Sequence, residues 1–250
     1  GTSEVTLLGQ TVNSYHDGQH DFADLLRAVG AVDGIRRVRF TSPYPTDFTR
    51  RVIEAMAGTP NVCEHVHLPV QSGSNAVLRR MLRRYTRERY LEVVRELRES
   101  MPGITLSTDI IVGFPGETEA QFEETLALIA EADFDDAYTF KYSVRDGTPA
   151  ARLGSHLPDE VAGARLERLI EVVRANARRK NVARVGQVHE VLVERPARRG
   201  GFMLGRTRGN HLVLLELAAE SVGEYHAVRL TGTTGSTFTG AVDAPSLAVL

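Results

Sequence analysis

The sequence predicts an α/β fold in which an incomplete (β/α) barrel is followed by a small antiparallel β-barrel. Up to about residue 142, apolar runs of strand character alternate with stretches whose apolar residues recur at helical spacing. The run at residues 110–112 is β-branched and unbroken by polar residues, which is typical of a parallel strand covered on both faces. Between residues 188 and 242, five short strand-like runs separated by turn signals favour a small barrel of the oligonucleotide-binding kind.

Five strands and five helices are expected in the first part of the chain. The strands are expected at residues 5–8, 38–41, 66–70, 104–112 and 137–142. The helices are expected at residues 22–29, 48–56, 74–82, 86–97 and 118–129. Thr118 and Gln121 form a capping box at the start of the last helix. Right-handed crossovers make such a sheet wind as an incomplete barrel, whereas an open doubly wound sheet fits less well because no G-x-G-x-x-G follows the first strand.

The last third of the chain has a different pattern. A helix is expected from Asp159, and it becomes strongly basic at residues 178–180. Strands are then expected at residues 188–193, 202–206, 212–217, 225–230 and 236–242. We therefore expect two domains, at residues 1–184 and 185–250.

Composition limits the classes of protein that need to be considered. The 250 residues are 42% hydrophobic with a net charge of −2, so the chain can bury a sizeable core and has no global attraction to nucleic acid or membrane. No apolar run approaches the roughly 18 residues of a membrane span, and no signal peptide is recognisable, so a cytoplasmic protein is expected. Cys63 is the single cysteine, which excludes an internal disulfide and a multi-cysteine metal site made by this chain alone. We expect it to be a small core residue.

Basic residues are concentrated in one region. Residues 174–208 contain ten basic side chains against two acidic ones, a local charge of +8 that favours RNA as a partner. The expected RNA-binding residues are Arg178, Arg179, Lys180, Arg195, Arg198, Arg199, Arg206 and Arg208. A second basic cluster at residues 79–89 is equally consistent with a solvated helix face.

Polar residues follow several of the predicted strands, where a barrel brings them to one face. The segment 108–118 joins a strand through a glycine-proline turn to a helix N-terminus and is suited to hold a ligand, although a capped turn without a ligand is the alternative. Glu117 argues against a bare phosphate there. His65 and His67 share one face of their strand, as do Ser107 and Asp109, and the histidines are either metal ligands or hydrogen-bonding residues.

Several long motifs resemble one family, the radical S-adenosylmethionine methylthiotransferases. They lie in the same order along nearly the whole chain, at residues 7–15, 62–74, 108–118 and 147–151, and residues 205–210 resemble that family's C-terminal TRAM domain. Residues 68–74 are similar to the subfamily that modifies tRNA rather than to the one that modifies a ribosomal protein, which remains the alternative.

The resemblance implies a TIM-like barrel of the radical S-adenosylmethionine type and a methylthio transfer to C2 of an isopentenylated adenosine beside the anticodon. It also implies two 4Fe-4S clusters in the intact parent, S-adenosylmethionine as cofactor, and an electron donor such as flavodoxin or ferredoxin. We expect a monomer. The residues implied to line the cofactor pocket are Gln10, Asn13, His67, Gln71, Ser107, Asp109, Gly113 and Arg145, with Arg145 near a ligand carboxylate.

The departure from the family is the absence of a C-x-x-x-C-x-x-C loop, whose three thiolates hold the cluster. We expect a fragment that begins just after that loop, has no metal ligands of its own, and is inactive alone. Two further classes stay open: an RNA-binding module without catalysis, and a different barrel enzyme that binds a phosphorylated metabolite at residues 113–116.

Overall fold

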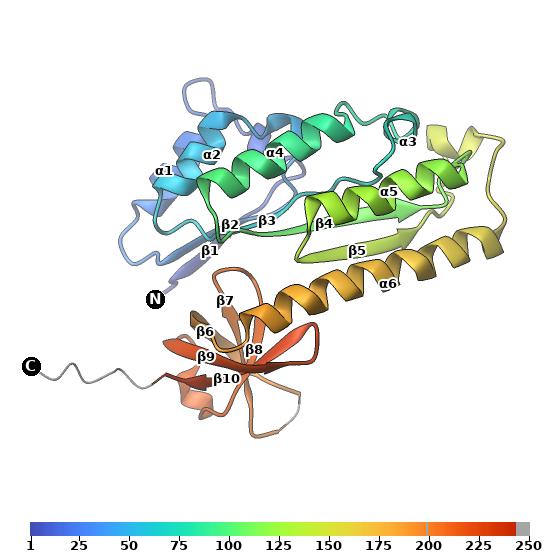
Figure 1. The fold of residues 1–250 in the computed structure, drawn as a ribbon. Helices are drawn as coiled ribbons and strands as arrows, with labels where there is room; N and C mark the ends of the chain where they lie inside the picture. Colours follow the sequence, from blue (N-terminus) through green and yellow to red (C-terminus); the bar gives the residue numbers. More distant parts are fainter. Residues whose placement is uncertain (199, 244–250) are drawn as a thin grey trace, which may run out of the picture. The chain divides into compact units, whose positions relative to one another are not determined.

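The computed structural model describes residues 1–198 and 200–243, and the chain divides into two compact units. These are Gly1–Asn176 and Ala177–Leu250, so the boundary falls inside the long helix α6 (Asp159–Arg184; Figure 1). Each unit has its own hydrophobic core. Among the described residues, no helix is both long and apolar enough to cross a bilayer.

The larger unit is built on five parallel strands. They are β1 (Glu4–Leu7), β2 (Arg37–Phe40), β3 (His65–His67), β4 (Thr105–Val112) and β5 (Asp136–Lys141). β1 pairs with β2, and β3, β4 and β5 form a three-stranded sheet in that order. A parallel bridge between Val38 and Val62 links the two sheets, so the strands follow one another as in an incomplete barrel, and the predicted fold class is confirmed.

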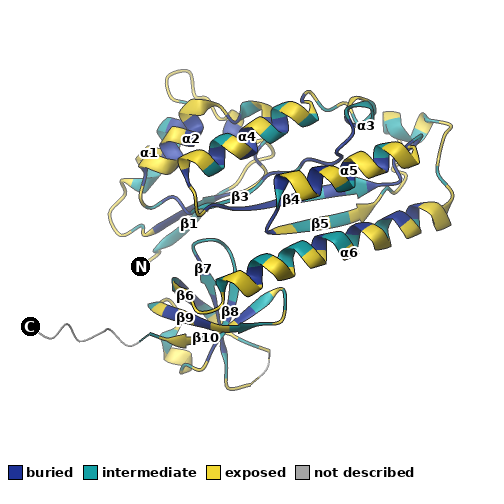
Figure 2. Ribbon diagram, viewed as in Figure 1, coloured by how far each residue is buried: buried dark blue, intermediate teal, exposed yellow. Residues whose placement is uncertain are grey.

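The helices of this unit alternate with the strands. They are α1 (Phe22–Gly30), α2 (Arg50–Gly58), α3 (Asn75–Arg80), α4 (Arg87–Ser100) and α5 (Glu119–Ala132). Figures 1 and 2 show α1, α2, α4 and α5 on one face of the strands, with their buried residues toward the sheet. The predicted capping box at α5 is confirmed, because the Thr118 hydroxyl accepts from the Gln121 N–H and the Gln121 side chain accepts from the Thr118 N–H.

Two boundaries differ from the sequence prediction for identifiable reasons. Phe48 does not belong to a helix: a 3-10 turn η2 (Pro45–Asp47) precedes it, and the Thr49 hydroxyl caps α2 by accepting from the Val52 N–H. The predicted strand at 66–70 ends earlier, at His67, since Pro69 has no N–H to donate to a ladder.

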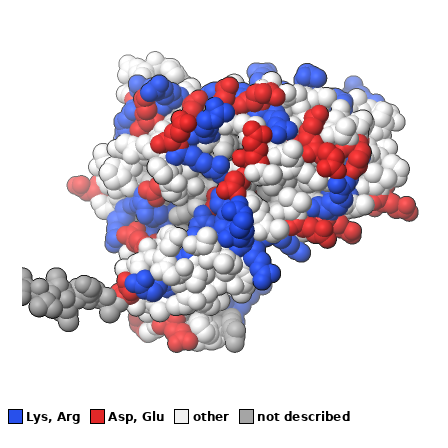
Figure 3. Space-filling view, in the orientation of Figure 1, with Lys and Arg blue, Asp and Glu red and all other residues white. Residues whose placement is uncertain are grey.

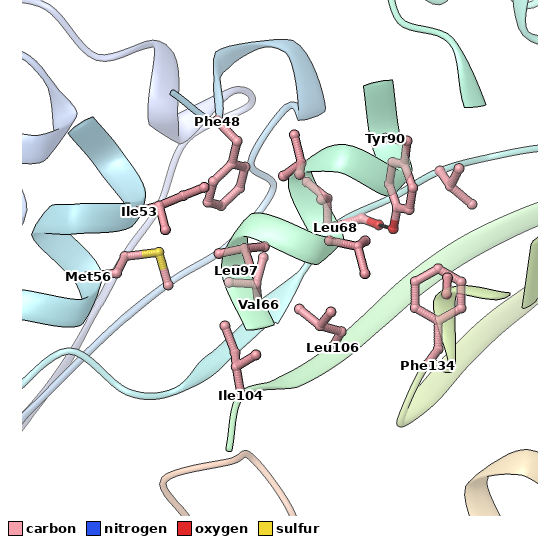
Figure 4. Packing of buried hydrophobic residues seen from close by; sticks show 14 of the residues in the cluster. Phe48, Ile53, Met56, Val66, Leu68, Tyr90, Leu97, Ile104, Leu106 and Phe134 are labelled. Carbon is pink, nitrogen blue, oxygen red and sulfur yellow. Dashed lines mark hydrogen bonds between the residues drawn. The ribbon is translucent and has the colours of Figure 1, made fainter. Parts of the chain in front are cut away.

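The core of the larger unit lies between the helices and the sheet. Figure 4 shows Phe48, Ile53 and Leu97 from the helical side meeting Val66 and Leu106 from the strands. The fully buried Tyr90 places its hydroxyl in this core and donates to the Leu68 carbonyl at 2.7 Å (Figure 4). Burial raises the pKa of the Tyr90 phenol, so it stays a neutral donor at the end of β3.

The smaller unit is a closed five-stranded barrel. Its strands are β6 (Val188–Pro196), β7 (Met203–Thr207), β8 (Leu212–Leu215), β9 (Tyr225–Thr233) and β10 (Thr237–Val242). The order around the barrel is β10-β8-β7-β6-β9. All pairs are antiparallel except β8 with β10, which closes the barrel in parallel register. Val191, Val213, Val228 and Phe238 are fully buried at its centre.

Candidate ligand-binding site

A cavity of about 470 Å³ opens at the carboxyl ends of β3, β4 and β5. Its size is within the range of small-molecule sites, and its position is where α/β sheets bind ligands. On the strand side it is lined by Gln71, Asp109 and Ile111, and by Phe114 just beyond β4. The segment after β5 adds Tyr142 and Arg145, and the 3-10 turn η3 (Pro149–Arg152) follows it.

A chain of polar side chains lies on β3 and β4 and ends at this cavity. The His65 Nε2 lies 3.4 Å from the Ser107 hydroxyl, which lies 3.0 Å from His67 Nδ1. The His67 Nε2 in turn is 3.3 Å from a carboxylate oxygen of Asp109, which lines the cavity. The structure therefore brings together three of the predicted site residues, His67, Ser107 and Asp109. It gives both histidines hydrogen-bonding neighbours.

Gln71 has an unusual backbone at the cavity wall. Its φ is +71°, in the left-handed region that residues with a Cβ rarely adopt. Two backbone hydrogen bonds to β4 hold it there, from its N–H to the Asp109 carbonyl at 2.8 Å and from the Ile111 N–H to its own carbonyl at 2.9 Å. Strained residues of this kind cluster at functional sites, which agrees with the expected role of Gln71.

The loop after β4 is supported by Glu117, whose presence the sequence analysis took as evidence against a bare phosphate site. Its carboxylate is buried within the protein and does not line the cavity. Its side chain is fully buried and accepts from the Gly113 N–H at 2.8 Å and from Arg165 Nη1 at 2.9 Å. Burial raises the pKa of Glu117 in spite of these bonds. Gly113 has a φ of +73°, and a Cβ there would lie 2.7 Å from the Ala162 Cβ. Backbone conformation and packing thus account for glycine at this predicted site position.

The two predicted site residues after β1 do not line the cavity. Asn13 is buried in the 3-10 turn η1 (Val12–Ser14), where its amide donates to the Tyr44 carbonyl and accepts from the Tyr44 N–H. It therefore joins the segments that follow β1 and β2. Gln10 is exposed in the turn before η1 and makes no side-chain hydrogen bond among the described residues.

The cavity lining includes polar residues that the sequence did not single out as site residues, among them Arg80, Arg83 and Tyr142. Arg80 and Arg83 belong to the basic cluster at residues 79–89, for which the sequence left a solvated face and a polyanion site open. Tyr142 is the first residue after β5, where the sequence predicted the last residue of the strand at 137–142. The sequence could therefore show that residues lie near a strand end, but it could not show which of them line the same cavity.

The smaller unit carries the residues predicted to bind RNA. Arg178 and Arg179 are exposed on the last turns of α6, and Arg195 and Arg198 are exposed at the end of β6 and just after it. Lys180 and Arg208 are partly buried, and Arg199 lies outside the described residues. Arg206 is engaged by the fold, with its Nε 2.6 Å from a Glu194 carboxylate oxygen and Nη1 donating to the Asn210 side chain.

The described residues do not supply a metal centre by themselves. Within residues 1–198 and 200–243, no three His, Cys, Asp or Glu side chains are grouped so that they could hold a metal ion. Cys63, the single cysteine of the sequence, is buried with 2% of its surface exposed, as expected of a small core residue. An iron–sulfur cluster of the three-thiolate kind does not fit this donor set.

Two sequence families match the two units, the parallel α/β unit with its cavity and the closed five-stranded barrel. The Radical SAM superfamily matches residues 1–129, and the TRAM domain family matches residues 182–242. The chain therefore belongs to the Radical SAM superfamily. Its members use S-adenosylmethionine and a 4Fe-4S cluster.

Two curated relatives show how specific the similarity is. The chain is 46% identical over 244 residues to a tRNA-2-methylthio-N(6)-dimethylallyladenosine synthase of Clostridium botulinum, covering 96% of this chain and 54% of the relative. It is 51% identical over 237 residues to the protein of the same name from Thermus thermophilus, covering 94% of this chain and 51% of the relative. The chain thus spans about half the length of the curated relatives it matches, and the predicted family resemblance is confirmed.

Among solved structures, the coproporphyrinogen III oxidase HemN from Escherichia coli, a radical SAM enzyme, aligns with a TM-score of 0.56 at 15% sequence identity. The alignment covers 91% of this chain and 54% of that one. At this identity the likeness supports the fold alone.

Proposed function

We propose that this chain forms the substrate-binding and cofactor-binding part of a methylthiotransferase that modifies C2 of N6-dimethylallyladenosine in tRNA. The observation that carries the proposal is 46–51% identity over nearly the whole chain to synthases named for that product. A cavity at the strand ends and a TRAM-type barrel with exposed arginines support it. A tRNA substrate also favours a cytoplasmic location, and we propose a monomer served by a flavodoxin or ferredoxin as electron donor.

The cofactor site belongs to the same proposal. His67, Gln71, Ser107 and Asp109 would hold S-adenosylmethionine on the strand side, with Gly113 beside it and Arg145 near its carboxylate. The size of the cavity and its mixture of one carboxylate with the apolar Ile111 and Phe114 are suited to a nucleoside. When bound to a cluster, this cofactor supplies radical chemistry, and the residues here orient it and exclude water. Of the predicted residues, Gln71, Asp109 and Arg145 line the cavity, and His67 and Ser107 connect to it through Asp109. Gly113, Gln10 and Asn13 are outside the lining, and Asn13 is occupied by the Tyr44 backbone.

The cluster ligands must come from polypeptide other than these 250 residues, since the sequence has one cysteine and it is buried. We therefore propose that the chain alone is catalytically inactive. Reconstitution of the 250-residue chain with iron and sulfide tests this proposal. We expect no 4Fe-4S absorbance band and no cleavage of S-adenosylmethionine, and the appearance of both would contradict it.

The substrate is tested by binding to an anticodon stem-loop that carries dimethylallyladenosine. We expect tighter binding than to the same RNA with plain adenosine, and affinity that falls as salt rises because phosphate contacts release counterions. A peptide from a ribosomal protein serves as the control for the related subfamily. Equal binding to both RNAs would favour the second candidate, an RNA-binding module without substrate selection, which the absence of cluster cysteines also permits.

A further inference from the structure

The wall of the cavity contributed by the end of α3 and the loop after it is cationic and incompletely partnered. Arg80 and Arg83 line it, and within residues 1–198 and 200–243 the buried Nε atom of each has no hydrogen-bond partner. The buried hydroxyl of Tyr142, which lines the same cavity, likewise has no partner in this part of the chain. Buried donors without acceptors are costly, so three of them around one cavity favour a ligand acceptor that these side chains could turn to meet.

Other arginines of the same basic cluster are neutralised by the protein. Arg87 Nη2 lies 2.8 Å from a Glu131 carboxylate oxygen, and Arg89 Nη1 lies 3.1 Å from Glu92. On the face drawn in Figure 3, basic and acidic side chains are similarly interspersed. Among the described residues, neither Arg80 nor Arg83 has a carboxylate at ion-pair distance. The cluster at residues 79–89 therefore divides into structural arginines and arginines that face the cavity.

Arg80 is held in place by neutral groups. Its Nη2 donates to the Gly116 carbonyl at 3.2 Å and to the Gln121 side-chain oxygen at 2.9 Å, and the guanidinium also interacts electrostatically with the buried Glu117 carboxylate, which already pairs with Arg165. The cavity lining adds the cations Lys141 and Arg145 to Arg80 and Arg83, against the single carboxylate of Asp109. Lys141 is paired with Asp159 outside the lining. An excess of positive charge remains at the cavity, and it favours an anionic ligand.

The geometry of the donors suits a phosphate. Guanidinium groups bind phosphate oxygens through charge-assisted hydrogen bonds, and a phenol adds a further donor. We infer that Arg80 and Arg83 bind a backbone phosphate of the RNA strand next to the adenosine that is modified. This inference rests on the proposed function, because it takes an RNA as the substrate that meets S-adenosylmethionine at the cavity. The larger unit would then contribute sequence-independent RNA binding in addition to that of the small barrel.

The test compares ligands that differ only in phosphate. N6-dimethylallyladenosine, its 3′,5′-bisphosphate and adenosine 3′,5′-bisphosphate are titrated into the 250-residue chain by calorimetry. We expect the bisphosphate to bind roughly tenfold more tightly than the nucleoside, as charge-assisted hydrogen bonds require. Arg83→Gln removes this advantage, and Arg79→Gln, at the end of α3 in the same basic cluster but outside the cavity lining, keeps it. Arg83 makes no side-chain hydrogen bond among the described residues, so the variant should keep the wild-type melting temperature.

The outcomes separate this inference from the proposed function. If both bisphosphates bind equally and Arg83→Gln weakens both, the phosphate site stands and the dimethylallyl substrate fails. If the nucleoside binds as tightly as its bisphosphate, the phosphate site is wrong whatever the substrate. S-adenosylmethionine is titrated because its carboxylate could compete for the same arginines: a loss of its affinity in Arg83→Gln, with no effect of phosphate, would assign these arginines to the cofactor carboxylate and overturn the inference.

Discussion

The polar residues after β1 and β2 and those after β3, β4 and β5 occupy equivalent places in the sheet but differ in what they bind. After β1, the Asn13 amide is occupied on both sides by the Tyr44 backbone. After β3 and β4, Gln71 and Asp109 line a cavity, and Arg80 and Arg83 beside them retain unpartnered donors. The difference teaches that a position at a strand end is not enough to make a residue a candidate for binding. The residue must also have hydrogen-bonding groups that the fold does not already use.

The largest effect is expected where the fold braces the cavity. Arg165→Ala leaves the fully buried Glu117 carboxylate without its cation, and we expect the free energy of unfolding to fall by about 3–5 kcal/mol. Arg168→Ala is the matched control, since Arg168 is largely exposed and pairs with Glu119 and Glu123, and its cost should stay below about 1 kcal/mol. Urea denaturation measures both, and equal losses would show that burial of the pair does not matter.

The pH dependence of the same variant sharpens this result. Burial already raises the pKa of Glu117, and removal of Arg165 raises it further, so the carboxyl stabilises the fold when protonated and costs stability when ionised. The stabilisation from the protonated Glu117 carboxyl is fully present at pH values below its pKa in the unfolded chain. It is lost as the pH rises through its pKa in the folded protein. The deficit of Arg165→Ala should therefore grow with rising pH across that window, and a constant deficit would contradict the assigned cause.

A smaller loss is expected at the first group of strand ends. Asn13→Ala leaves the Tyr44 N–H and carbonyl without their partner, and we expect destabilisation of about 2 kcal/mol. Gln10→Ala is the control, with an expected change within about 0.5 kcal/mol because its side chain is exposed. Both are read from thermal unfolding. Affinity for S-adenosylmethionine should be unchanged in Asn13→Ala, and a loss comparable to that in the next variant would restore Asn13 to the binding site.

At the second group of strand ends, binding should change and stability should not. Asp109→Asn keeps the shape of the side chain but removes the one carboxylate of the cavity lining, and we expect roughly tenfold weaker binding of S-adenosylmethionine. Asp136→Asn, at the start of β5 and outside the lining, is the matched control. Calorimetric titration checks both. Loss of stability without loss of affinity would place Asp109 among the structural residues.

The smallest expected effect concerns the other unit. The double variant Arg195→Gln and Arg198→Gln removes two exposed cations, and the slope of log affinity for RNA against log salt should decrease by about 2. Arg206→Gln is the control with the same charge change, because Arg206 is paired with Glu194 and should contribute little to the slope. Filter binding over a salt series distinguishes the two variants.

Most of the fold could be predicted from the sequence because hydrophobic period and capping residues act locally. The five parallel strands, the Thr118 cap and the five-stranded barrel all follow from such patterns. The parallel closure of β8 with β10 could not be predicted, since both are short strands and their pairing depends on the path of the whole barrel. The burial of Arg37 inside a strand was also hidden, because it depends on tertiary partners such as Glu4 on the neighbouring strand.

The candidate site could be predicted only in part. The proximity of His67, Ser107 and Asp109 could be predicted because period 2 places side chains on one face and parallel register brings the strands together. The role of Glu117 could not be predicted, since its partner Arg165 comes from a helix 48 residues further along the chain. Arg80 and Arg83 were not distinguished from Arg87 and Arg89 for the same reason. Tertiary packing decides which of these arginines has a carboxylate partner.

At Gln71, whose backbone is left-handed, thermal stability and ligand binding favour different residues. Glycine would adopt the same φ of +71° without strain. The backbone strain of the folded state would therefore be smaller in a Gln71→Gly variant than in the wild-type protein. A laboratory selection for heat resistance without regard to activity should therefore accept Gln71→Gly readily, and the accepted variants would lack the side chain that we propose as a ligand contact. The persistence of glutamine at this position under selection for activity would be a record of the binding function itself.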